Sequence, residues 1–299
     1  MCVTCGCSED AQVTVTPLNE HQSHTHTLSD GTVIHHTHHD DHHHHHHHTH
    51  HPDHHSERHP ENHPVHHAPN PQETAQIHAD LHHTTVTLEH NILAKNNLIA
   101  AQNRGWLKGR NTLALNLVSS PGSGKTTLLT RTITDLKAEI PIHVIEGDQE
   151  TLNDARRIQA TGCRVVQINT GTGCHLEASM VEQGLNQLDP PLHSIVMIEN
   201  VGNLVCPALF DLGEQAKVAI LSVTEGEDKP IKYPHMFRAS DVMILTKIDL
   251  LPYLTFEVDR CLDYARQVNP KIQIFQVSST TGAGLDGWYD WLRSAWREV

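Results

Sequence analysis

The sequence Ser-Ser-Pro-Gly-Ser-Gly-Lys-Thr-Thr at residues 119–127 restricts the fold of this chain more than any other stretch. It follows an apolar run at 113–118, which predicts a buried strand, and it precedes an apolar-rich stretch at 128–133, which predicts the start of a helix. A strand, a glycine-rich turn ending in Gly-Lys-Thr and a helix together predict a phosphate-binding loop. In such a loop, backbone N–H groups and the positive end of the helix dipole face a bound anion.

Most positions of this loop have a predicted role in nucleotide binding. Lys125 supplies a cation for the β- and γ-phosphates, and the hydroxyl of Thr126 is a candidate ligand for Mg²⁺. Ser119 stands where the pattern has glycine, so the turn must begin there without a positive φ, or with strain. An ordinary strand-to-helix turn with a solvated lysine is the alternative interpretation. The predicted nucleotide-binding residues of the loop are Pro121, Gly122, Ser123, Gly124, Lys125, Thr126 and Thr127.

The remainder of the chain alternates apolar runs with helical patterns, which is typical of an α/β fold. A helix is expected at 86–104, ahead of the first strand, and an amphipathic helix at 285–297 closes the domain. We therefore predict a mostly parallel β-sheet flanked by helices and preceded by a disordered N-terminal tail. The further predicted strands lie at 142–148, 164–168, 194–198, 217–223, 242–245 and 272–277.

Acidic residues follow two of these strands, at the edge where ligands bind to open parallel sheets. Asp148 ends one strand and is a candidate Mg²⁺ ligand, directly or through water. Glu199 follows another strand and can reach Mg²⁺ or the attacking water, while Gly202 can offer its backbone N–H to the γ-phosphate. Asp154 either orients water or serves a helix, as its cap or as a solvated surface residue. Lys125, Asp148 and Glu199 are the predicted catalytic residues.

The sequence Thr246-Lys247-Ile248-Asp249 resembles the base-reading pattern N-K-x-D of GTPases. The carboxylate of Asp249 can accept hydrogen bonds from N1–H and N2–H₂ of guanine, which adenine does not offer, and the stem of Lys247 can lie over the ring. Thr246 replaces the usual asparagine, so one polar contact is weakened or remade. Ser278 lies in a loop expected under the base. A small-molecule kinase that prefers ATP is the rival reading, and Asp249 argues against it.

Composition separates the first 90 residues from the rest. They hold 26 of the 30 histidines and a formal charge of −11, whereas the remainder carries −3. With so few apolar side chains this tract cannot build a core, and we expect residues 20–87 to be disordered and to bind metal through neutral imidazoles. A cloned purification tag is a poor alternative, because the histidines are internal and spread among varied neighbours.

Two groups of cysteine and histidine are candidate metal sites. Cys2, Cys5 and Cys7 can turn three thiolates toward one ion, with the terminal amine as a fourth donor; a zinc clip or spare thiols in a tail are the alternatives. Cys174 and His175 lie in the first turn of an expected helix, where the helix field favours a thiolate. Cys206 either completes a site with them or is a buried structural cysteine.

Several classes of protein are not expected from the sequence. No basic face argues for nucleic-acid binding, and no apolar run approaches the roughly 18 residues that a membrane helix needs. The first residues lack a signal-peptide pattern, and the 7 cysteines are an odd number. We therefore expect a cytoplasmic protein whose thiols are reduced.

These motifs together resemble the HypB family of nickel-incorporation GTPases that mature [NiFe]-hydrogenases. The resemblance covers about residues 88–299 and the terminal Cys-x-x-Cys-Gly-Cys, and its most specific pieces are Gly-Cys-His at 173–175 and Glu-Asn-Val-Gly-Asn-Leu-Val-Cys-Pro at 199–207. It implies GTP hydrolysis, GTP-promoted homodimerisation, the partner HypA and delivery of nickel to the hydrogenase large-subunit precursor. It implies three parts: a cysteine motif at 1–19, a histidine tract at 20–87 and a GTPase domain at 88–299.

The resemblance also assigns the metal sites. Cys2, Cys5 and Cys7 match the tight nickel site of some family members. A weaker nickel or zinc site near the dimer interface corresponds to Cys174, His175 and Cys206, and the histidine tract matches members that store nickel. Two alternatives stay open, a histidine-rich metal store with an incidental GTPase and a urease-type nickel-insertion GTPase. The cysteine motif and the Gly-Cys-His site favour the hydrogenase branch.

Overall fold

The structure is a computed structural model that describes residues 14–17, 24–27, 33–36, 71–148, 153–171 and 173–299. Cys2, Cys5, Cys7 and the run of histidines at 42–48 lie outside these ranges. Contacts divide the chain into two units, one of residues 1–18 with 84–299 and one of residues 19–83.

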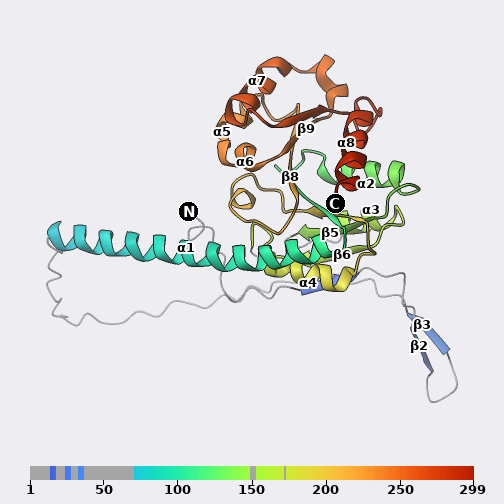
Figure 1. Cartoon of the computed structure of the whole chain (residues 1–299), viewed down its shortest axis with the longest axis horizontal. Helices are drawn as coiled ribbons and strands as arrows, with labels where there is room; N and C mark the ends of the chain where they lie inside the picture. Colours follow the sequence, from blue (N-terminus) through green and yellow to red (C-terminus); the bar gives the residue numbers. More distant parts are fainter. Residues whose placement is uncertain (1–13, 18–23, 28–32, 37–70, 149–152, 172) are drawn as a thin grey trace, which may run out of the picture. The chain divides into compact units, whose positions relative to one another are not determined.

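The larger unit is built on an eight-stranded sheet with the order β1-β6-β5-β7-β4-β8-β9-β10 (Figure 1). All neighbouring strands from β6 to β10 pair in parallel, and β1 pairs antiparallel with β6 at one edge. The predicted mostly parallel sheet is confirmed. Its strands are β1 Thr14–Pro17, β4 Leu113–Ser119, β5 Ile142–Asp148, β6 Val165–Asn169, β7 Ile195–Glu199, β8 Ala216–Ser222, β9 Val242–Thr246 and β10 Gln273–Gln276.

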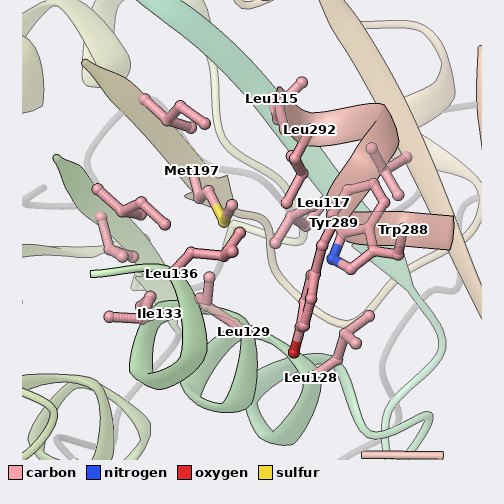
Figure 2. Packing of buried hydrophobic residues seen from close by; sticks show 14 of the residues in the cluster. Leu115, Leu117, Leu128, Leu129, Ile133, Leu136, Met197, Trp288, Tyr289 and Leu292 are labelled. Atoms are coloured by element: carbon pink, nitrogen blue, oxygen red, sulfur yellow. The ribbon is translucent and has the colours of Figure 1, made fainter. Parts of the chain in front are cut away.

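Helices cover both faces of this sheet because alternate strand residues point to opposite sides. On one face Leu115 and Leu117 of β4 pack with side chains of α2 and α8, among them Trp288 (Figure 2). On the other face Ala114 belongs to a core that includes residues of α1 and α4, while α6 and α7 pack on β8 and β9. The helices are α1 Pro71–Gly109, α2 Lys125–Leu136, α3 Asn153–Gln159, α4 Ala178–Leu188, α5 Lys229–Lys232, α6 Pro234–Ala239, α7 Val258–Val268 and α8 Leu285–Arg297, with 3₁₀ turns η2 Cys206–Ala208 and η3 Ile248–Tyr253.

The structure differs from the sequence expectation at several elements. Helix α1 begins at Pro71 rather than at residue 86. Proline suits a first helical position, and Ile77 and Leu81 extend the helical spacing of Leu88 toward it. Strand β1 was not predicted, since four residues give too little periodicity and only pairing with β6 defines it. In the smaller unit, β2 His24–Thr27 pairs antiparallel with β3 Val33–His36. For the rest of the histidine tract, disorder stays a prediction.

Among the described residues, no helix combines the length and the apolar character that crossing a membrane requires.

Gly147 fixes the distance between β5 and the segment that enters α4. A Cβ atom at this position would lie 2.8–2.9 Å from three side-chain carbons of Leu176, which is fully buried. Glycine therefore lets Leu176 pack directly against the β5 backbone. This contact holds His175, one residue earlier, beside the strand that ends at Asp148.

We expect Gly147→Ala to lower the free energy of unfolding by about 1–3 kcal/mol, because the new methyl group overlaps Leu176 in a closed core. Urea unfolding measures the change. Gly105→Ala in α1 is the matched control: a Cβ there has no neighbour within 4 Å, so alanine should stabilise the helix by about 0.5–1 kcal/mol. Equal effects of the two substitutions would contradict the close packing.

Candidate nucleotide and metal site

The phosphate-binding loop has the backbone that the sequence requires of it. Gly122 and Gly124 have φ values of 76° and 90°, and Gly124 directly precedes α2. Ser119 is the last residue of β4 and has no positive φ, so the absent glycine causes no strain. The left-handed residues of the turn are instead Gly122 and Gly124, immediately before α2. Its backbone can therefore present N–H groups to an anion at the start of α2.

Lys125 and Thr126 both contact the end of β7. The Nζ of Lys125 donates a hydrogen bond to the backbone oxygen of Asn200 and lies 3.3 Å from Oε1 of Glu199. The hydroxyl of Thr126 donates to the same Oε1 at 2.6 Å. Oε2 of Glu199 is buried and makes no hydrogen bond within the described part of the chain. A buried carboxylate oxygen and an adjacent threonine hydroxyl are donors that suit Mg²⁺, so these residues fit the predicted ion.

A second buried carboxylate, Glu146, lies beside Glu199. The two residues are register partners on the adjacent parallel strands β5 and β7, and each is 2% exposed. Burial, and then the negative charges of Glu199 and Asp148, raise the pKa of Glu146 to about 8. The sequence analysis did not assign Glu146 a role. The signal that could have found it is an acidic residue inside an otherwise apolar run.

Other predicted residues of this edge lie where ligands bind in parallel sheets. Asp148 is the last residue of β5 and is half-buried. A Cβ on Gly202 would lie 3.1–3.2 Å from Pro121, so glycine lets this backbone approach the loop. Asp154 forms an exposed ion pair with Arg157 at 3.1 Å, and Arg157 also donates to the hydroxyl of Thr127. This geometry favours the surface reading of Asp154.

Two of the residues predicted to read the base contact the same loop. The hydroxyl of Thr246 donates to the backbone oxygens of Ser123 at 2.6 Å and Leu221 at 3.3 Å. Thr246 thus remakes a polar contact to the loop in place of the usual asparagine. Lys247 has a left-handed φ of 60° and donates from Nζ to the oxygen of Gly122 at 2.7 Å.

The two remaining positions predicted to meet the base follow the ends of β9 and β10. Asp249 lies half-buried in the first turn of η3. Ser278 is fully buried, and its hydroxyl accepts a hydrogen bond from the backbone N–H of Thr281 at 3.1 Å. Ser278 therefore shapes its own loop in this structure.

Cys174, His175 and Cys206 come together although they belong to separate segments. Their ligand atoms all lie within 4.8 Å of one another. The two sulfurs are 3.0 Å apart, longer than a disulfide bond of about 2.05 Å, and Sγ of Cys174 lies 3.6 Å from Nδ1 of His175. Burial lowers the pKa of His175 to about 4, so its imidazole is neutral at neutral pH and can donate a lone pair. Two sulfurs and one imidazole are a donor set for zinc or nickel.

Two further cysteines stand apart from this cluster. Cys163 and Cys261 are buried, and burial raises the pKa of each thiol to about 12. Both are therefore held as neutral thiols in the core, unlike a metal ligand, which binds as thiolate.

Comparisons with known proteins identify relatives of this chain. A family model described as CobW/HypB/UreG, nucleotide-binding domain, matches residues 113–276. Hydrogenase maturation factor HypB of Escherichia coli (strain K12) is 58% identical over 207 residues, which are 69% of this chain and 71% of that protein. Hydrogenase/urease maturation factor HypB of Helicobacter pylori is 37% identical over 231 residues, 76% of this chain and 95% of that protein. The crystal structure of HypB from Helicobacter pylori in complex with nickel aligns with a TM-score of 0.64 at 38% identity, covering 68% of this chain and 96% of that one.

We expect Glu146→Gln to change how stability depends on pH in the nucleotide-free protein. The pKa of this carboxyl is about 8 in the folded protein, whereas its ordinary value is 4.5. The folded protein therefore holds this proton more tightly than the unfolded chain does, so the wild-type free energy of unfolding falls as the pH rises from 4.5 through 8. Glutamine has no proton to lose, so at about pH 9 the variant should be more stable than wild type by about 2–4 kcal/mol.

Urea unfolding in chelator across this pH range measures the difference. Glu182→Gln, on an exposed position of α4, is the control and should keep the wild-type slope. A Glu146→Gln profile parallel to wild type would show that Glu146 does not titrate in this range.

Proposed function

This chain belongs to the CobW/HypB/UreG family, in which it groups with HypB, and we propose that it hydrolyses GTP to GDP and phosphate to deliver Ni(II) into the large-subunit precursor of a [NiFe]-hydrogenase. The observation that carries the proposal is the position of Cys206. It lies four residues after Gly202, on the segment that leaves β7 beside the phosphate-binding loop, and its thiol meets Cys174 and His175. The nickel ligands and the nucleotide therefore share one segment of chain.

Binding of GTP would compete for contacts that Lys125 and Thr126 make with Glu199 and Asn200. The γ-phosphate would attract Nζ of Lys125 away from Glu199 and Asn200, and the backbone N–H of Gly202 would donate to the same phosphate. Mg²⁺, held by Thr126 and by the carboxylates of Asp148 and Glu199, would neutralise phosphate charge. The segment from Glu199 to Cys206 would then be ordered when GTP is bound and released after hydrolysis. Such a nucleotide-dependent switch would control the binding of the metal ion that the protein delivers.

The cluster has the character of a site for transfer. Three protein ligands leave at least one coordination position for a second copy, for a HypA-like nickel chaperone or for the precursor. Val205 and Leu209, on either side of η2, are about half exposed and provide an apolar rim for such a partner. We propose that GTP promotes a homodimer here, and that Zn(II) can occupy the same ligands.

The N-terminal region has a supporting role in this proposal. Cys2, Cys5 and Cys7 would hold nickel tightly, and the histidine tract would store it. If the protein only stores nickel, deletion of residues 20–85 would abolish its effect in the cell. If it delivers nickel, the deletion variant would still mature hydrogenase when nickel is ample. The Helicobacter pylori relative is named for urease as well as hydrogenase, so a urease precursor is the alternative recipient.

We expect Cys206→Ala to weaken Ni(II) binding at the cluster at least tenfold and to remove its dependence on nucleotide. The full chain carrying Ser at Cys2, Cys5 and Cys7 isolates the thiolate-to-nickel charge-transfer band of the cluster, because histidine sites give no such band. Titration with GDP and with a GTP analogue measures the affinity. Cys261→Ala, a buried thiol in α7, should behave as wild type. Identical nickel release from Cys206→Ala and wild type would remove the coupling.

Guanine selectivity provides a separate test. Asp249→Asn replaces a carboxylate, which accepts hydrogen bonds from guanine, by an amide, which can also donate one. The affinity for GTP should fall at least tenfold. The affinity for xanthosine triphosphate should rise, because xanthine has a carbonyl where guanine has an amino group. Competition against a fluorescent GDP measures both. Asp259→Asn, near the start of α7, is the control. Wild-type preference for ATP over GTP would support the kinase reading instead.

A further inference from the structure

Asn200 is a junction between the phosphate-binding lysine and the metal cluster. Its backbone oxygen accepts the hydrogen bond from Lys125. Its side-chain oxygen accepts from the backbone N–H of Leu176, at 3.1 Å, and this residue directly follows His175. A single buried asparagine thus contacts both the lysine that would meet the γ-phosphate and the chain that holds one metal ligand.

From Asn200 the hydrogen bonds continue through the sheet. Its Nδ2 donates to Oδ1 of Asn116 at 3.2 Å, and Nδ2 of Asn116 donates to Oε1 of Glu214 at 3.1 Å. Asn116 is fully buried in the middle of β4, where the other side chains are apolar except at its final serine. An asparagine in such a strand is costly unless its amide is satisfied, and here both of its ends are bonded.

Glu214 then meets a buried lysine that holds the Cys206 segment. Nζ of Lys217 lies 3.7 Å from Oε1 of Glu214, and the two side chains are 8% and 7% exposed. The same Nζ donates to the backbone oxygens of Pro207 at 2.8 Å and Phe210 at 3.3 Å. Pro207 directly follows Cys206, and the ring centroid of Phe210 lies 4.0 Å from that of His175. This ammonium therefore holds the segment that carries Cys206 and packs against His175.

The energetic cost of these groups indicates a specific role. A buried Lys–Glu pair loses the solvation of both charges, and apolar side chains of similar volume commonly stabilise a fold as well or better. The pair lies outside the cluster and outside the nucleotide loop, so neither ligand requires it directly. What it does provide is fixed geometry between β4, β7 and η2.

We propose that Asn200, Asn116, Glu214 and Lys217 form a buried positioning network that transmits the nucleotide state from Lys125 to Cys206 and His175. When a γ-phosphate draws Lys125 from the oxygen of Asn200, the asparagine loses one of its anchors, and the shift passes to the N–H of Leu176 and through Lys217 to the backbone beside Cys206. The inference rests on the proposed function, because it assigns the residues by which nucleotide and metal are coupled.

The test compares nickel affinities in two nucleotide states for variants that leave all ligands intact. The full chain with Ser at Cys2, Cys5 and Cys7 is titrated with Ni(II), following the thiolate charge-transfer band, with GDP and with a non-hydrolysable GTP analogue. The ratio of the two dissociation constants measures coupling. The variants are Lys217→Met with Glu214→Gln, which leaves no unpaired buried charge, and Asn116→Ala, which cuts the network at its centre.

The matched control is Asn269→Ala. The Nδ2 of Asn269 also donates to two backbone oxygens, those of Phe237 and Ser240, but it joins α6 to α7 and has no part in the network. This control separates a general loss of hydrogen bonds from a loss of this connection.

We expect the two Ni(II) dissociation constants of the wild type to differ by at least about fivefold. In both network variants they should differ by no more than about twofold. The affinity of these variants for GDP should equal that of the wild type. Asn269→Ala should keep the wild-type ratio. Network variants that bind GDP normally and keep the wild-type ratio would overturn the inference and leave the proposed function standing. A wild-type ratio of one would overturn the coupling itself, and the network with it. If the Lys217 and Glu214 double variant does not fold, Asn116→Ala decides the outcome.

Discussion

The contact of Lys125 with the end of β7 is the interaction on which the rest of this site depends. Its ammonium lies between the carboxylate of Glu199 and the backbone oxygen of Asn200, all at low exposure. An ammonium and a carboxylate attract each other strongly away from water, but a triphosphate carries more negative charge than either partner. In the nucleotide site that we propose, a phosphate would therefore compete with Glu199 and Asn200 for this ammonium.

The sheet concentrates negative charge at one edge, and this makes the exchange sensitive to a cation. Register places Glu146 beside Glu199, and Asp148 follows at the end of the same strand. Burial, and then the negative charges of Glu199 and Asp148, raise the pKa of Glu146 to about 8, so this carboxyl retains its proton at neutral pH. A cation bound at this edge would offset the negative charges of Glu199 and Asp148.

The metal cluster combines a ready ligand with an open coordination sphere. Burial keeps His175 neutral, so the imidazole need not lose a proton to bind at neutral pH. The two thiols come from segments that enter α4 and follow β7, so the distance between the sulfurs depends on how those segments lie. Among the described residues the cluster offers three donors on separate segments, and such a site would hold an ion less permanently than a closed four-ligand site does. That property suits an ion that is cargo.

Much of this protein could be read from its sequence, because the relevant signals are local. Three signals can be recognised from neighbouring residues alone. They are the glycine-rich turn before Lys125, the apolar runs of the parallel strands and the Thr-Lys-Ile-Asp segment at 246–249. Their periods and turn chemistry specify strand, loop and helix without knowledge of the fold. Candidate ligands such as Asp148 and Cys174 follow from the same signals, since parallel strands end at a common edge.

Tertiary structure alone decided which distant residues meet. Glu146 lies beside Glu199 because β5 and β7 are neighbours in the sheet and pair in this register. Strand β6, which lies between them in the chain, is on the other side of β5. Asn116 and Lys217 look like polar interruptions of apolar strands until their partners 84 and 10 residues away are known. Whether Cys206 was a ligand or a core thiol was equally undetermined by its neighbours. Side-chain chemistry is encoded locally, but the pairing of side chains depends on strand order and register, which are properties of the whole chain.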